Sequence, residues 1–205
     1  MNDPQIVPLF SQPLYINKIR LNQSMIDAVV NTKCINSNEG YNNGWMSDTQ
    51  WLTTQPEIRS IIEEHLSQYV FNTLAVDNTK HQLEHTSSWV NLHKPGDSSG
   101  AHTHNNSMFS GVMYFKVPPN SGDILFRIQN MIPTWCTETL YPEVTEYNQY
   151  NMREARIPTE DGMILLFPSH LEHSVTLNNS SDRYSMAFNY ILRGQYGMRD
   201  TQLVL

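Results

Sequence analysis

The chain has 205 residues, the size of one domain, which can bury roughly 70% of its unfolded surface without a disulfide framework or a structural metal. Its 13 Lys and Arg against 20 Asp and Glu give a net charge of −7, which argues against bulk nucleic acid and against an anionic membrane as partners. No apolar run approaches the ~20 residues that span a bilayer, the first residues do not resemble a secretory signal, and the two cysteines predict a cytoplasmic protein.

The N-terminal third is predicted to be extended and then helical. Ile6–Ile19 contains prolines that disfavour a helix, and Asn22–Asn31 has the apolar spacing of a short helix. Lys33–Thr54 is rich in Asn, Gly, Ser and Trp and predicts a long ordered loop. The clearest helix is predicted over Gln55–Leu74, with Pro56 in its first turn and Thr53 or Thr54 as its cap.

After Asn78 the pattern changes to short strands separated by Pro, Gly, Asn and Asp. Helices followed by many short strands predict a mostly β domain, an antiparallel sandwich or barrel with N-terminal helices against it. We expect one domain over 1–205, with a strand and helical buttress at 1–80, the β core at 81–193 and a tail at 194–205. The predicted strands are His85–His93, Met108–Val117, Asp123–Arg127, Glu154–Ile157, Met163–Phe167, Ser174–Leu177 and Arg183–Leu192.

Two of these strands have one apolar and one polar face. From Arg183 to Tyr190, the positions Arg183, Ser185, Ala187 and Asn189 alternate with four apolar ones, and Trp89, Asn91 and His93 alternate with Val90 and Leu92. The apolar faces suit packing against a helix or sheet. The polar faces predict a barrel with a wet interior.

Candidate metal ligands lie between these strands. His102 and His104, two residues apart, point the same way if the backbone is extended, so both imidazoles can reach one ion, although such a pair is also typical of a solvated loop. His173 follows an apolar strand that ends in Phe-Pro, and Arg183 comes ten residues later. An arginine inside a barrel needs an anion, either a structural carboxylate or that of a ligand.

Together, His102/His104, the Phe-Pro-Ser-x-x-x-His that ends at His173, and Arg183-x-Ser185 resemble the iron- and 2-oxoglutarate-dependent dioxygenases. The similarity extends over about Leu83–Tyr190 to an oxygenase family known from bacteria and their phages. The segments that carry it are Trp89–Asn91, Lys94–Asp97, Ser110–Phe115 and Arg183–Asn189. The resemblance implies a double-stranded β-helix, which is a cupin-like jelly roll, and a host that is a bacterium or a phage-infected cell.

The resemblance also implies roles for individual residues. His102 and His173 would bind Fe(II), and Arg183, assisted by Ser185, would bind the distal carboxylate of 2-oxoglutarate. Tyr114 and Asn91 are candidates for further hydrogen bonds to this co-substrate. The departure is His104, which occupies the position where the superfamily usually has a carboxylate. Either His104 completes a neutral three-histidine site, or Asp97 swings in, or the position stays open.

The predicted activity is oxidative decarboxylation of 2-oxoglutarate coupled to oxidation of a small-molecule or peptidyl substrate. One alternative is a cupin-like three-histidine metalloprotein that does not use 2-oxoglutarate, and another is a non-enzymatic jelly-roll binding module. The long loop Thr134–Asn151, with Trp135, Tyr141, Tyr147 and Tyr150, is a candidate lid or an ordinary packed loop. The tail Gln195–Leu205 or an exposed barrel edge would be the contact of a homodimer.

Overall fold

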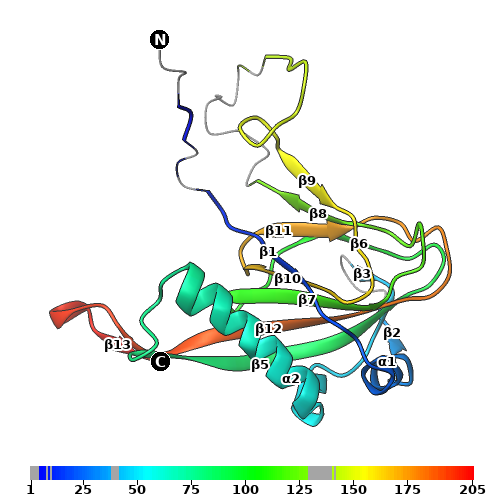
Figure 1. The fold of residues 1–205 in the computed structure, drawn as a ribbon, viewed down its shortest axis with the longest axis horizontal. Helices are drawn as coiled ribbons and strands as arrows, with labels where there is room; N and C mark the ends of the chain where they lie inside the picture. Colours follow the sequence, from blue (N-terminus) through cyan, green and yellow to red (C-terminus); the bar gives the residue numbers. More distant parts are fainter. Residues whose placement is uncertain (1–4, 8, 10, 38–41, 129–139, 141) are drawn as a thin grey trace.

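Two antiparallel sheets that face each other form the body of the molecule (Figure 1). The computed structural model describes residues 5–7, 9, 11–37, 42–128, 140 and 142–205. The large sheet has the strand order β1-β10-β7-β12-β5-β4-β2, with β13 paired to β12, and the small sheet has the order β3-β6-β11-β8-β9. From β5 to β12 the chain crosses from one sheet to the other at every step except between β8 and β9, which is the arrangement of a jelly roll. The predicted mostly β class with N-terminal helices and the double-stranded β-helix are therefore confirmed.

The strands of the large sheet come from all along the chain. They are β1 (Tyr15–Lys18), β2 (Ile35–Asn36), β4 (Trp45–Met46), β5 (His81–His93), β7 (Phe109–Lys116), β10 (Met163–Pro168), β12 (Arg183–Tyr196) and β13 (Leu203–Val204). The small sheet consists of β3 (Asn42–Asn43), β6 (Ser98–His102), β8 (Ile124–Arg127), β9 (Glu154–Ile157) and β11 (Glu172–Val175).

The helices cover the outer face of the large sheet (Figure 1). They are α1 (Gln23–Val30), the 3₁₀ turn η1 (Trp51–Thr54), α2 (Pro56–Ser67) and the π-helical turn η2 (Gln68–Thr73), and a further 3₁₀ turn, η4 (Arg199–Thr201), lies near the C-terminus. None of the described helices is long and apolar enough to cross a membrane.

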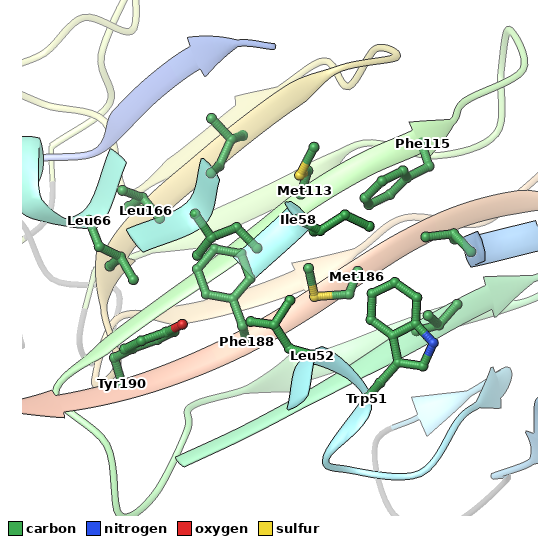
Figure 2. Close-up of a cluster of buried hydrophobic side chains, with 14 of the residues drawn as sticks. Trp51, Leu52, Ile58, Leu66, Met113, Phe115, Leu166, Met186, Phe188 and Tyr190 are labelled. Carbon is green, nitrogen blue, oxygen red and sulfur yellow. The ribbon is translucent and has the colours of Figure 1, made fainter. Parts of the chain in front are cut away.

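The main hydrophobic core lies between these helices and the sheet. Figure 2 shows Leu52, Ile58 and Leu66 from the helical layer against Met186 and Phe188 of β12. The positions Ile58, Ile62 and Leu66 recur every four residues along α2, so one stripe of that helix is buried. A second, smaller core between the two sheets contains Val112, Tyr114, Ile124, Phe126, Leu165, Phe167 and Leu171.

The two faces of β12 separate as the alternation predicts. Tyr184, Met186, Phe188 and Tyr190 belong to the core beneath the helices. Arg183, Ser185 and Ala187 line the pocket between the sheets instead. A strand that satisfies the apolar core with one face can therefore present polar side chains to the interior of the barrel with the other.

Several local predictions were wrong: β5 begins at His81 rather than His85, and β12 continues to Tyr196 rather than ending at Leu192. The long helix ends as an α-helix at Ser67 and continues as a π turn, closed by Leu74 N donating to Tyr69 O, and this turn buries both Tyr69 and Val70. Its N-cap is Gln55, because Thr53 and Thr54 belong to the preceding 3₁₀ turn. β11 begins two residues earlier than predicted, at Glu172.

The loop prediction for Lys33–Thr54 missed three two-residue strands and η1, while 38–41 lie outside the described residues. Strand β6 was also missed. Its sequence, Ser-Ser-Gly-Ala-His, has none of the β-branched or aromatic residues that favour strands, and it is held by pairing with β3 and β11 on its two sides.

Gly111 in β7 predicts a strong effect on stability. A Cβ at this position would lie 2.8 Å from the carbonyl oxygen of Leu165 and in collision with the Phe188 ring. Because a backbone atom and a core ring would both have to move, Gly111→Ala is expected to lower the free energy of unfolding by about 1–3 kcal/mol. Urea denaturation measures this, and an unchanged midpoint at unchanged slope would contradict the expected collision.

Candidate metal centre and co-substrate pocket

The pairing of β6 with β11 brings two of the predicted ligands together. His102, the last residue of β6, lies directly opposite His173 in the antiparallel register. His104 follows two residues after β6, where its backbone N donates to the carbonyl of Ser169 at 2.9 Å. Two neighbouring strands and one backbone hydrogen bond thus place three imidazoles from distant parts of the sequence at one end of the barrel.

The three imidazoles converge closely enough to hold one ion. One ligand nitrogen from each of His102, His104 and His173 lies within 4.8 Å of the other two. The ring centroids are 4.3 Å apart for His102 and His173, 5.0 Å for His104 and His173, and 5.3 Å for His102 and His104. They form the one group of three or more metal-ligating side chains found among the described residues.

Each of these rings has its Nδ1 bound to an oxygen. Nδ1 of His102 bonds to Gly100 O at 2.8 Å, and Nδ1 of His173 bonds to Leu171 O at 3.0 Å. Nδ1 of His104 bonds to the side-chain oxygen of Asn189 at 2.6 Å. A carbonyl oxygen only accepts, so the ring proton lies on Nδ1 in all three and the lone pair lies on Nε2. That is the tautomer in which Nε2 can bind a metal.

Burial keeps these imidazoles neutral. It lowers the pKa of His173 to about 3, with a further contribution from His102 and His104, and it lowers the pKa of His104 to about 4. The pKa of His102 is also lowered by burial. Metal binding requires neutral imidazole, so none of the three has to lose a proton at neutral pH.

A buried arginine lies on the opposite wall of the same pocket. Arg183 is 1% exposed, and its guanidinium carbon lies 4.9 Å from the centre of the Tyr114 ring. Nε and Nη2 of Arg183 and the hydroxyl of Tyr114 have no hydrogen-bond partner among the described residues. A buried cation with unsatisfied donors is costly unless a ligand supplies the acceptors. The donors present therefore fit a carboxylate.

The other predicted co-substrate residues form a row beside this arginine. Ser185 of β12 is registered with Asn91 of β5 on one side and with Tyr114 of β7 on the other. All three line the pocket. The oxygen of the Asn91 amide accepts from Trp89 Nε1 at 3.1 Å, so the amide nitrogen is the atom of this side chain that can donate to a ligand.

His93 is a pocket residue that the sequence did not single out. It is registered opposite Arg183, is 3% exposed, and its Nδ1 lies 3.5 Å from Nη1 of Arg183. Its Nε2 bonds to Ser99 Oγ at 3.0 Å. The available signal was the polar alternation that it shares with Asn91, two residues earlier. Burial, and then the charge of Arg183, lowers the pKa of His93 to about 3.

The other side chains considered are not members of the three-histidine group among the described residues. The carboxylate of Asp97 accepts from Lys94 N at 2.8 Å in its own turn and does not belong to the three-histidine group. His170 is exposed. Of the aromatic residues in the predicted lid, Trp135 and Tyr141 lie outside the described residues, while Tyr147 and Tyr150 are exposed.

The described lining of the pocket contains neither aspartate nor glutamate. It consists of Met46, Trp89, Asn91, His93, Ser99, His102, His104, Gly111, Val112, Tyr114, Ile124, Phe167, His173, Val175, Arg183, Ser185 and Ala187. Glu172, which is not part of this lining, partly offsets the lowered pKa of His102. The pocket therefore carries the positive charge of Arg183 and suits an anion.

Solved structures share this fold over nearly the whole chain. A prolyl-4-hydroxylase from Pseudomonas putida has a TM-score of 0.56 and 13% identity, with 91% of this chain and 96% of that chain covered. The non-haem α-ketoglutarate-dependent carbocyclase SnoK from nogalamycin biosynthesis has a TM-score of 0.60 and 14% identity, with 93% and 85% covered. HygX from Streptomyces hygroscopicus, solved with nickel and 2-oxoglutarate, has a TM-score of 0.55 and 9% identity, with 87% and 82% covered.

At the level of sequence, no curated protein matches the chain. A family model does, and its description is "Putative 2OG-Fe(II) oxygenase". It matches residues 87–189, which is half of the chain and extends from β5 to Asn189 of β12. This span includes the three histidines of the cluster and also Tyr114, Arg183 and Ser185. The chain belongs to this family, and it is an oxygenase that uses Fe(II) and 2-oxoglutarate.

Proposed function

We propose that His102, His104 and His173 hold the Fe(II), and that Arg183 binds the distal carboxylate of 2-oxoglutarate with help from Ser185, Tyr114 and Asn91. The observation that carries this assignment is one acid-free pocket with three convergent, neutral imidazoles on one wall and an unsatisfied buried guanidinium on the other.

Charge supports the pairing of this metal site with a dianion. Three neutral imidazoles offset none of the two positive charges of Fe(II), and Arg183 adds a third in the same pocket. 2-Oxoglutarate has two carboxylates, so one molecule can compensate the guanidinium with one end and the metal with the other. A neutral ligand would leave both cations buried and uncompensated, which is costly.

When bound, Fe(II) and 2-oxoglutarate with dioxygen supply the oxidation, in which 2-oxoglutarate becomes succinate and carbon dioxide while the substrate is oxidised. The residues of this chain bind and orient. Arg183 fixes one end of the co-substrate, and the donors of Tyr114 and Asn91 restrict its rotation. The apolar lining, with Val112, Ile124 and Phe167, excludes water from the interior of the pocket.

The substrate is proposed to be a small molecule or a peptidyl side chain. His102 and His104 are half-buried, whereas His173 and Arg183 are buried, so we expect the substrate to approach from the side of His102 and His104. Neither a cupin-like metalloprotein that does not use 2-oxoglutarate nor a binding module explains why a charged arginine, Arg183, is buried in this pocket. We therefore rank both below the oxygenase assignment.

An anaerobic titration of the apo-protein with Fe(II) and 2-oxoglutarate tests the assignment. We expect a weak visible charge-transfer band, typical of a 2-oxoacid chelated to Fe(II), only when both components are present. The band is expected to be lost in His173→Ala and Arg183→Ala. Iron binding without a band in the wild type would contradict the proposed co-substrate site, and no iron binding would contradict the proposed ligands.

Two further proposals concern the setting of the enzyme. We propose a cytoplasmic location, which the small number of cysteines supports. We also propose a homodimer that forms through the C-terminal hairpin of β12 and β13. The hairpin supports this role because Met198, Leu203 and Val204 are exposed on it, and Figure 1 shows it extending from the body of the sheets.

A further inference from the structure

Asn189 is a buried polar residue that connects β12 to the proposed metal centre. It is 6% exposed and lies at the end of the polar face that Arg183 begins. Its side-chain oxygen accepts from Nδ1 of His104 at 2.6 Å and from Oγ of Ser110 at 2.7 Å. Its amide nitrogen donates to Oγ of Ser87 at 3.0 Å. All the polar atoms of its amide are thus engaged.

Asn189 is held by Ser87 of β5 and Ser110 of β7, and the turn after β10 supports Ser110 through Ser169. Ser110 Oγ also lies 2.8 Å from Oγ of Ser169, and both serines are at most 1% exposed. Ser169 in turn accepts from the backbone N of His104 through its carbonyl oxygen. The backbone of His104 and its imidazole are therefore anchored by one connected polar network. Networks of this kind rigidify a site when every member is satisfied.

His104 differs from the other two histidines in what binds its Nδ1. His102 and His173 each use the backbone carbonyl of the residue two positions earlier, Gly100 and Leu171. His104 lies beyond the end of β6 and uses a side chain 85 residues away. Ser110 Oγ lies 2.9 Å from the same Nδ1, so the orientation of His104 depends on two side chains, Asn189 of β12 and Ser110 of β7, whereas that of the other two follows from local backbone structure.

We infer that Asn189 is the positioning residue that makes His104 a metal ligand, by holding the ring proton on Nδ1 and directing Nε2 at the ion. This inference rests on the proposed function of the site. It adds that the third ligand is specified by an amide on β12, which belongs to the sheet opposite the strand β6 that precedes His104. Because an amide is neutral where a carboxylate often supports a metal-bound histidine, Asn189 also keeps the site free of protein negative charge.

Metal affinity of the full chain without co-substrate is the measurement that tests this inference. Co(II) titration, followed by its visible absorption, gives the Kd of the wild type, of Asn189→Leu and of Asn189→Asp. Leucine has nearly the shape of asparagine but offers no acceptor, and we expect it to weaken Co(II) binding about 10- to 100-fold. Aspartate keeps the acceptor and adds charge, and we expect it to bind Co(II) more tightly than the wild type.

Asn178→Ala is the matched control. Asn178 is equally buried, at 1% exposure, but its amide bonds only to backbone groups, at His93 O, Ser181 O and Ser180 N. This variant should lower the melting temperature and leave the Kd for Co(II) unchanged, which separates loss of stability from loss of positioning.

Each outcome has a distinct meaning. Wild-type affinity in Asn189→Leu, combined with weakened binding in His104→Ala, would overturn the role of Asn189 while the proposed function stands. If Asn189→Leu does not fold, Asn189→Ala, which also removes the acceptor, takes its place, and wild-type Co(II) affinity in that variant overturns the inference. Failure of the wild type to bind Co(II) or Fe(II) would contradict the proposed function itself.

Discussion

Arg183→Ala is expected to abolish turnover of 2-oxoglutarate at ordinary concentrations. Removing one partner of a buried, hydrogen-bonded charge pair costs about 2–5 kcal/mol, which corresponds to roughly 30- to several-thousand-fold in affinity. The loss should appear in the Kd and KM for 2-oxoglutarate, whereas the affinity for metal alone should stay close to that of the wild type. Isothermal titration calorimetry and succinate formation measure the two effects.

The arrangement of β12 provides a matched control for this variant. Arg193 lies on the same strand but is exposed, and it pairs with Glu84 at 2.7 Å. Arg193→Ala removes an equal charge and should leave 2-oxoglutarate binding unchanged, since exposed ion pairs contribute little. A short 2-oxoacid without a distal carboxylate should bind Arg183→Ala as well as it binds the wild type. Equal loss of both co-substrates would contradict the proposed role of the arginine.

Stability gives an independent readout of the same residue. Arg183 is buried against Tyr114 and His93. Six ion pairs are found in the described part of the chain, and none of them includes Arg183. An unpaired buried charge destabilises the folded apo-protein. Arg183→Met, which keeps most of the volume and removes the charge, should therefore raise the apo-protein's melting temperature while it lowers 2-oxoglutarate affinity.

Most of this site could be predicted from the sequence because its chemistry depends on residue type and strand period. The alternation that begins at Arg183 correctly assigned one face of β12 to the pocket and the other to the core. The spacing of His102 and His104 and the position of His173 singled out these three histidines as candidate ligands. The structure adds the register of β6 against β11, which turns three separate signals into one cluster.

What the sequence could not provide is the set of contacts that depend on the tertiary register. His93 faces Arg183 because β5 and β12 pair in one particular register, and the polar alternation that it shares with Asn91 does not reveal this partner. The bond from His104 to Asn189 spans 85 residues. Strand β6 was missed since its composition does not favour a strand, and only its neighbours hold it there.

His104→Ala is expected to be as damaging as His173→Ala. If both imidazoles bind the metal, each variant removes a direct ligand and should weaken binding by more than the roughly 10- to 100-fold typical of supporting residues. Turnover should fall to background in both. Asp97→Asn is the control, because the structure holds that carboxylate at Lys94 N, outside the histidine cluster. Full metal affinity in His104→Ala, together with its loss in Asp97→Asn, would instead identify Asp97 as the third ligand.

The variant His104→Asp tests whether the neutral charge of the three-histidine site links the binding of Fe(II) to that of 2-oxoglutarate. With three neutral ligands, metal affinity depends on the dianionic co-substrate. Saturating 2-oxoglutarate should therefore raise the affinity for Fe(II) by about 5- to 150-fold. Because the coupling is reciprocal, Fe(II) must raise the affinity for 2-oxoglutarate by the same factor. His104→Asp supplies the missing negative charge from the protein. Because less charge then remains for the co-substrate to offset, His104→Asp should bind Fe(II) alone more tightly than His104→Ala does, and the coupling factor should shrink. An unchanged factor in His104→Asp would mean that charge at this position does not link the two ligands, and that the coupling comes from chelation alone.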